Sequence, residues 1–199
     1  MEYIAHRINT LEELKELPLE WGVELDLRDD LNGRIYIQHN PFEPGQDFED
    51  YLKAYHHGTM ILNIKSERIE HKILEMLPYY DIKSYFFLDS SFPMIWLLSR
   101  AGEKNIALRV SEAEGLDTAR NMAGKVDWIW LDCFSRIPIG KKEYDELKNL
   151  GYKICFVSPE LQGREQDLVS YKKELAVKGM IMDAICTKKH NIKIWKADK

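Results

Sequence analysis

Two acidic residues stand two positions apart in the apolar run VELDL, close to the start of this 199-residue chain. Side chains two positions apart on a strand leave the same face, so Glu24 and Asp26 can bind one divalent cation together. His6 precedes this pair and His39 follows it. Because imidazole ionises near neutral pH, the two histidines can serve as a general acid and a general base.

Basic side chains complete this set of reactive groups. Arg7, Lys65 and Arg109 each fall near the end of a strand-like run and can offset the charge of a phosphate group. Acids that bind a cation, imidazoles that move protons and cations that hold an anion are together what phosphoryl chemistry requires.

Each of these residues also has a purely structural interpretation. A lone Glu-x-Asp is a solvated face or a salt-bridge partner in roughly three cases of four. His6 alone is at least as often a hydrogen-bonded core histidine, and Arg109 can pair with Asp132 across neighbouring strands. The remaining histidines are expected at the surface or as caps: His56, His57, His71 and His190.

The elements that must position these residues alternate along the chain. Short β-branched and aromatic runs are separated by segments of helical period (residues 11–17, 48–56, 68–77, 93–102, 116–124, 142–151 and 166–179), which predicts parallel strands joined by helices. The predicted strands are Tyr3–Arg7, Val23–Leu27, Met60–Lys65, Tyr85–Asp89, Ile106–Val110, Trp128–Asp132, Lys153–Ser158 and Ala184–Thr187. Several helical segments end in a glycine, which accepts the left-handed conformation after a helix: Gly102, Gly124, Gly151 and Gly179.

An additional strand, Arg34–His39, follows the second strand after only the residues DDLNG. A connection this short cannot form a parallel crossover and predicts a hairpin. The other strands favour an α/β fold, a small TIM (β/α)8 barrel with a β-hairpin extension after strand 2, in which the C-terminal strand ends bring the reactive residues to one mouth. An open doubly wound sheet is the alternative, but no Gly-x-Gly-x-x-Gly follows the first strand.

Composition and charge limit the classes of protein. Hydrophobic residues make up 45% and charged residues 31% of the chain, and no linker is visible, so one domain over residues 1–199 is expected. The net charge of −5 argues against a general nucleic-acid surface, and no signal sequence or run of about 18 apolar residues occurs. We therefore expect a cytoplasmic protein with a small-molecule ligand, no membrane insertion and no obligatory protein partner. Cys133, Cys155 and Cys186 lie in separate apolar runs and are expected to be buried, reduced thiols.

The order and spacing of the motifs resemble the glycerophosphodiester phosphodiesterase family of metal-dependent TIM-barrel enzymes. The segment AHRINTLEEL supplies the His-Arg and Asn-Thr of the family's opening motif. The segment VELDLRDDLNGRIYIQHN supplies its Glu-x-Asp, the glycine of its hairpin turn and its second histidine, at the family's spacing. LNIK, IKSYFFLDSSF and MDAICTKKH resemble later strands of the family, so the resemblance spans most of the chain.

This resemblance assigns roles to the residues quoted. It implies that His6 and His39 are an acid–base pair, that Glu24 and Asp26 bind Mg²⁺ or Ca²⁺, and that Arg7 and Lys65 hold phosphate oxygens. A further metal ligand is expected at Asn63 or Asp89. The chain loses the glutamate before Asn-Thr and departs from the family's residue types at Ile8, Asn40, Asn63 and Lys188. Asn63 takes the place of the family's third metal-binding glutamate, and a neutral amide there weakens the affinity for a divalent cation.

Different functions are consistent with these residues. The first is metal-dependent hydrolysis of a small soluble glycerol- or sugar-phosphate diester by histidine acid–base catalysis. The second is a degenerate barrel that binds a phosphorylated ligand without turnover. The third, from the fold alone, is an unrelated barrel enzyme such as an aldolase or isomerase that uses Lys65 or Lys188.

Overall fold

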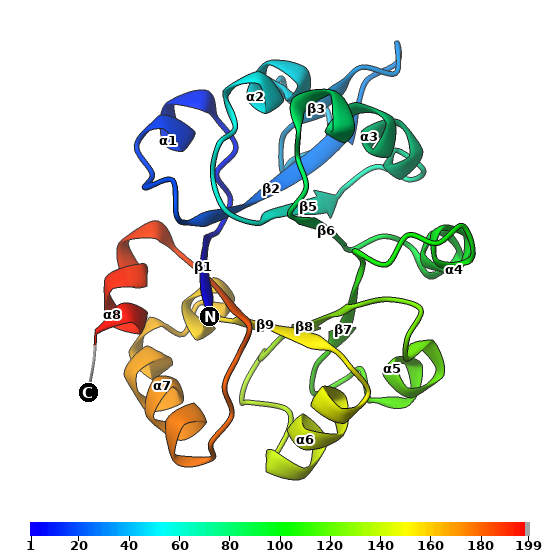
Figure 1. The fold of residues 1–199 in the computed structure, drawn as a ribbon. Coiled ribbons are helices and arrows are strands. Elements are labelled where there is room, and N and C mark those ends of the chain that lie inside the picture. Colours follow the sequence, from blue (N-terminus) through cyan, green and yellow to red (C-terminus); the bar gives the residue numbers. More distant parts are fainter. Residues whose placement is uncertain (198–199) are drawn as a thin grey trace.

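The computed structural model describes residues 1–197 and shows parallel strands arranged in a ring, with helices outside it (Figure 1). Around the ring the strands follow the order β7, β8, β9, β10, β1, β2, β5, β6. Their bounds are β1 Glu2–Ala5, β2 Gly22–Asp29, β5 Met60–Ile64, β6 Tyr85–Leu88, β7 Ala107–Val110, β8 Trp128–Leu131, β9 Lys153–Val157 and β10 Ala184–Thr187. The fold is a TIM barrel, which confirms the fold class and, within residues 1–197, each predicted parallel strand.

Helices follow the strands and cover the outside of the ring. The α-helices are α1 Leu11–Lys15, α2 Phe48–Ala54, α3 Glu70–Met76, α4 Phe92–Arg100, α5 Asp117–Met122, α6 Lys141–Asn149, α7 Leu168–Val177 and α8 Ile192–Lys196, with 3₁₀ turns at Leu77–Tyr80, Pro159–Gln162, Glu165–Asp167 and Lys189–Asn191. The four glycines predicted to end helices all have positive φ, between 62° and 97°. Among residues 1–197, no helix combines the length and apolar character needed to cross a membrane.

The predicted hairpin is present beside β2. Strand β3 (Ile35–Ile37) runs antiparallel to β2, with Ile37 opposite Leu27, and a short unpredicted strand, β4 (Gln46–Asp47), pairs with β3. Gly33 turns the chain between β2 and β3 with a φ of 74°, a conformation that glycine adopts without steric cost. The hairpin therefore lies next to the strand that carries both predicted metal-binding acids.

Alternation along β2 sends its acids into the barrel. Leu25 and its apolar neighbours two residues away belong to the buried layer between strands and helices. Glu24 stands in register with Ile61 of β5, which belongs to a separate cluster of buried side chains drawn from the other strands. Since register partners point the same way, Glu24 and Asp26 face inward, as their spacing predicted.

The strands of the ring share the fewest backbone contacts between β6 and β7. Each other pair of neighbours in the ring shares a strand ladder, whereas here a single parallel bridge joins Phe87 and Ile106 in the described chain. The Phe87 N–H also donates to the carbonyl of Asn105 at 2.9 Å. Beyond this bridge, toward the C-terminal ends of the strands, a cavity opens.

Candidate functional site

A strained turn after β1 carries His6 and Arg7. Arg7 has a φ of 56°, a left-handed conformation that costs a non-glycine residue of order 1–3 kcal/mol. Its backbone N–H donates to Oε2 of Glu24 at 2.8 Å, and the Ile8 N–H donates to the Glu24 carbonyl at 2.9 Å. These bonds offset the strain and attach the turn to β2.

Glu24 is a buried carboxylate that contacts groups from β5 and from the turn after β1. It is 1% exposed. Nδ2 of Asn63, on β5, donates to its Oε1 at 2.8 Å, and Nε2 of His6 lies 3.6 Å from its Oε2. The His6 side chain keeps 22% of its surface exposed. Glu24 therefore places a negative charge beside an imidazole that still meets solutes from outside.

Asp26 is also 1% exposed and lies between two basic side chains. Nε of Arg7 is 3.5 Å from its Oδ2, and Nζ of Lys65 is 3.7 Å from its Oδ1. Asn9 donates from Nδ2 to Oδ2 at 2.9 Å and accepts the Asp26 N–H on its Oδ1 at 3.1 Å. Burying a carboxylate costs several kcal/mol unless it is paired and hydrogen-bonded, and Asp26 is both.

The start of α1 fixes Asn9 in place. Thr10 caps the helix by accepting the Glu13 N–H at 3.2 Å, and the Glu13 carboxylate accepts the backbone N–H groups of Thr10 and Asn9 at 3.2 and 3.1 Å. This is the reciprocal capping box that Thr-x-x-Glu forms at a helix start. In the Asn-Thr of the opening motif, Asn9 therefore binds Asp26 and Thr10 caps the helix that follows.

These contacts bear on the predicted divalent-cation site. Each carboxylate oxygen of Glu24 and Asp26 already has a donor or a cation of the chain within 3.7 Å. Asn63 turns its amide nitrogen toward Glu24, while its Oδ1 is buried without a hydrogen-bond partner among the described residues, and Asp89 binds basic side chains instead. Within residues 1–197, no three His, Cys, Asp or Glu side chains are grouped to hold a metal ion. The residues present therefore do not fit a divalent cation.

His39 lies at the end of the hairpin, and its backbone is hydrogen-bonded to Arg28 of β2. Arg28 donates from Nη2 to the His39 carbonyl at 2.8 Å and from Nη1 to the Lys65 carbonyl at 3.0 Å. The Nδ1 of His39 lies 3.1 Å from Oδ1 of Asn40. The carbonyls of His39 and Lys65 thus accept from one guanidinium, while the side chain of His39 contacts Asn40.

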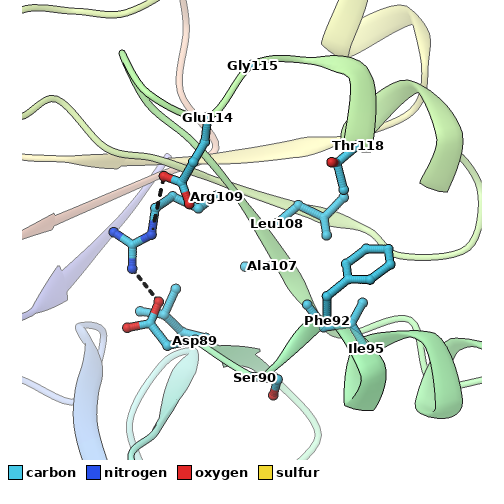
Figure 2. A pocket seen from close by; sticks show the side chains of 11 residues that line it. Asp89, Ser90, Phe92, Ile95, Ala107, Leu108, Arg109, Glu114, Gly115 and Thr118 are labelled. Atoms are coloured by element: carbon cyan, nitrogen blue, oxygen red, sulfur yellow. Dashed lines mark hydrogen bonds and ion pairs between the residues drawn. The ribbon is translucent and has the colours of Figure 1, made fainter.

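Arg109 is held by carboxylates at the ends of β6 and β8. Its Nη1 binds Asp132, its Nη2 binds Asp89, and its Nε lies 3.8 Å from Glu114. Figure 2 shows the contacts with Asp89 and Glu114. Burial alone lowers the pKa of the Arg109 guanidinium, but the charges of Asp89 and Asp132 outweigh it and raise that pKa above its usual value. The structural pairing of Arg109 with Asp132 is confirmed, and the Arg109 donors predicted to meet phosphate face carboxylates.

A cavity of about 420 Å³ lies beside this cluster, between the ends of β6 and β7 and the helices that follow them (Figure 2). Asp89 and Arg109 form one side of it, and the half-exposed ring of Phe92 and the side chain of Thr118 lie on the other. Ser90, also in the lining, is 8% exposed, and its hydroxyl has no hydrogen-bond partner among the described residues. Since Lys65 Nζ is 3.4 Å from Asp89, this cavity adjoins the residues around Asp26.

Sequence reasoning missed a buried acid after β9. Glu160 is 3% exposed and accepts hydrogen bonds from the hydroxyls of Ser158 and Thr187 and from the Lys188 N–H at 3.0 Å. It lies in the 3₁₀ turn Pro159–Gln162, where Gln162 also donates to Asp132 at 2.8 Å. The Ser-Pro at the end of a predicted strand was the available signal, because proline favours the first position of such a turn.

Comparison with known proteins identifies the fold. No protein-family model matches the chain, and no curated protein matches it. A glycerophosphodiester phosphodiesterase of Agrobacterium tumefaciens str. C58 is similar in structure, with a TM-score of 0.63 and 15% identity over 94% of this chain and 96% of that one. A glycerophosphoryl diester phosphodiesterase of Parabacteroides distasonis ATCC 8503 gives a TM-score of 0.66 and 10% identity over 98% of this chain and 85% of that one. At these identities the predicted resemblance is confirmed for the fold, and function must be argued from the site.

Proposed function

We propose that this protein hydrolyses small phosphodiesters at the mouth of the barrel, with His6 accepting the proton of the attacking water. The observation that carries the proposal is the partly exposed His6 imidazole, 3.6 Å from the buried Glu24 carboxylate. Arg7 and Lys65, which both contact Asp26, supply positive charge in the same part of the mouth. The structural neighbours named above are phosphodiesterases, which is consistent with this reaction class.

The proposed reaction needs groups that this chain supplies. Arg7 and Lys65 hold the anionic phosphoryl oxygens, and Glu24 keeps a proton on Nε2 of His6 so that Nδ1 can act as the base. Water forms a new bond to phosphorus, its proton passes to His6, and the bond from phosphorus to the ester oxygen breaks. Negative charge on the phosphoryl oxygens is stabilised by the two cations, which are positioned before the reaction begins.

His39 is the proposed acid that protonates the leaving alcohol. Its Nδ1 is engaged by Asn40, so Nε2 is the ring nitrogen left for proton transfer. Arg28 supports this role by attaching the His39 backbone to that of Lys65. An alkoxide leaves far more easily once protonated, so removing His39 should slow the reaction most for alcohols of high pKa.

The cavity beside Asp89 is the proposed place for the alcohol part of the diester. Its volume of about 420 Å³ lies in the range usual for small-molecule sites. Asp89 and Thr118 can accept hydrogen bonds from hydroxyl groups, and the ring of Phe92 offers an apolar surface. A glycerol- or sugar-phosphate diester has this combination of hydroxyls and carbon surface.

A second candidate function is binding of a phosphorylated ligand without turnover. It is favoured by the side-chain contact of His39, which is with Asn40, and by the neutral amide at Asn63. In that case the basic residues would still bind phosphate, but no proton would be delivered to the leaving group.

The two functions are distinguished by release of p-nitrophenol from bis-p-nitrophenyl phosphate, with and without added Mg²⁺ or Ca²⁺. We expect His6→Ala to lower kcat/KM by about 100-fold or more, the usual contribution of a general base. His190→Ala is the matched control, because Nε2 of His190 also lies 3.6 Å from a glutamate, Glu165, at an exposed position. Wild-type protein that binds phosphate but releases no product in any of these buffers would establish the second function.

A further inference from the structure

We infer that the Glu24–Asp26 pair carries its counter-charge within the chain, on Arg7 and Lys65, and that these cations take the place of a divalent metal. The part of this inference that concerns a phosphoryl ligand rests on the proposed function, whereas the part that concerns metal binding does not. It follows from the contacts of two carboxylates that are each 1% exposed.

Both carboxylate oxygens of Asp26 already face a cation of the chain. The Arg7 guanidinium reaches Oδ2 at 3.5 Å and the Lys65 ammonium reaches Oδ1 at 3.7 Å. A dication bound to either oxygen would lie within a few ångströms of a fixed positive charge in a buried place, where repulsion is weakly screened. Binding would therefore require Lys65 or Arg7 to move away.

Lys65 is itself held in position, which makes such a movement costly. Its Nζ lies 3.4 Å from Asp89 as well as 3.7 Å from Asp26, and its carbonyl accepts a hydrogen bond from Arg28. The side chain is 21% exposed, so the ammonium can still meet a bound anion. A cation placed this way compensates the buried acid and remains available to phosphate.

The residue at position 63 decides whether Glu24 needs a cation beside it. Asn63 donates its amide N–H to Oε1 of Glu24 at 2.8 Å, so the carboxylate is stabilised by a neutral donor. A glutamate at this position would lose that donor and bring a second negative charge to Glu24. Two adjacent buried carboxylates need a shared proton or a bridging cation. Asn63→Glu should therefore create the metal dependence that the natural chain lacks.

The test measures metal binding by the full chain in two ways. One is calorimetric titration with the metal, and the other is thermal unfolding in the presence of about 5 mM CaCl₂, MgCl₂ or MnCl₂, compared with thermal unfolding in chelator. For wild type we expect no saturable heat and a Tm that changes by less than about 1 °C. For Asn63→Glu we expect a lower Tm in chelator and a rise of about 5 °C with metal. Asn121→Glu, at an exposed position of α5, adds the same charge as a control and should behave as wild type.

Saturable binding to wild type with a Kd below about 0.1 mM, lost in Asp26→Asn, would overturn the inference. A folded Asn63→Glu variant that does not respond to metal would also overturn it. If that variant fails to fold with or without metal, the wild-type titration decides alone. None of these readouts uses turnover, so a protein without phosphodiesterase activity can still pass or fail this test.

Discussion

Replacing Arg109 with leucine should destabilise the protein strongly, because this guanidinium compensates a buried acid. Asp132 is 1% exposed and is bound by Arg109 and by Gln162. Removing one partner of a buried ion pair costs about 3–5 kcal/mol, and the remaining bond to Gln162 places the expected cost near the lower end. The contacts to Asp89 and Glu114 are more exposed and add less than about 1 kcal/mol each. We expect R109L to lower the free energy of unfolding by about 3–4 kcal/mol.

Urea unfolding at pH 7 measures this change by linear extrapolation, with R120L as the matched control. Arg120 also binds two carboxylates, those of Glu146 and Asp117, but on the exposed surface, so its loss should shift the unfolding midpoint far less. Adding D132N to R109L removes the uncompensated charge and keeps the contact with Gln162, and should restore about 2 kcal/mol. If R109L is no more destabilising than R120L, or if D132N restores nothing, the assignment of Arg109 as an internal counter-ion is wrong.

The pH dependence of R109L follows from the same contact. Burial raises the pKa of the Asp132 carboxyl, and loss of the Arg109 charge would raise it further. A carboxyl whose folded-state pKa is raised favours the folded state at low pH and loses that contribution as pH rises through the folded-state pKa. The difference in unfolding free energy between wild type and R109L should therefore be smaller at pH 5 than at pH 7. An equal difference at both pH values would show that Asp132 does not titrate in the variant.

Other regions give predictions that can be checked separately. Burial alone raises the pKa of Glu112, but hydrogen bonds from the loop after β8 outweigh it and lower the pKa from 4.5 to about 2. The contribution of Glu112 to the free energy of unfolding is therefore complete above about pH 4.5 and is lost as pH falls toward 2. In urea unfolding, the difference in stability between wild type and E112Q should be smaller at pH 3 than at pH 7, and an equal difference would contradict this. Phe92→Ala should raise KM for a glycerol phosphodiester by about threefold to tenfold with little change in kcat, whereas an equal loss of kcat would place Phe92 outside the alcohol site. Gly22→Ala would place a Cβ 2.4 Å from the carbonyl oxygen of Thr59 and should cost about 2–3 kcal/mol by urea unfolding, while Gly115→Ala, which meets nothing within 4 Å, should be far milder; equal effects would contradict the close packing.

The barrel strands were predictable because each is a short run rich in β-branched and aromatic residues between segments of helical period. The weak pairing between β6 and β7 was not predictable. It consists of one bridge, Phe87 to Ile106, and depends on the relative tilt of two strands, which no local sequence pattern reveals. Helix α8 (Ile192–Lys196) was missed because Ile192 and Ile194 flank a lysine, an alternation that is typical of a strand. Strand β4 was missed for a similar reason, since it has two residues.

The candidate site was predictable where a strand's period decides the direction of side chains, as for Glu24 and Asp26. The charges that meet these acids were not, because the contacts of Arg7 and Lys65 with Asp26 depend on the course of long side chains from outside β2. Sequence spacing cannot distinguish a basic side chain that is free to bind phosphate from one that is already paired with carboxylates. Glu160 was missed because its partners lie at the ends of two strands, and its burial becomes visible only once those strands are adjacent.

The most direct test of the proposed reaction is ³¹P NMR of a glycerol phosphodiester, such as glycerophosphoglycerol, incubated with the protein in buffer that contains chelator. A phosphomonoester resonance should appear with wild type and with His190→Ala, and its rate of appearance should fall by about 100-fold or more with His6→Ala. Wild type that yields no monoester, or His6→Ala that yields it at the wild-type rate, would contradict a metal-independent phosphodiesterase centred on His6.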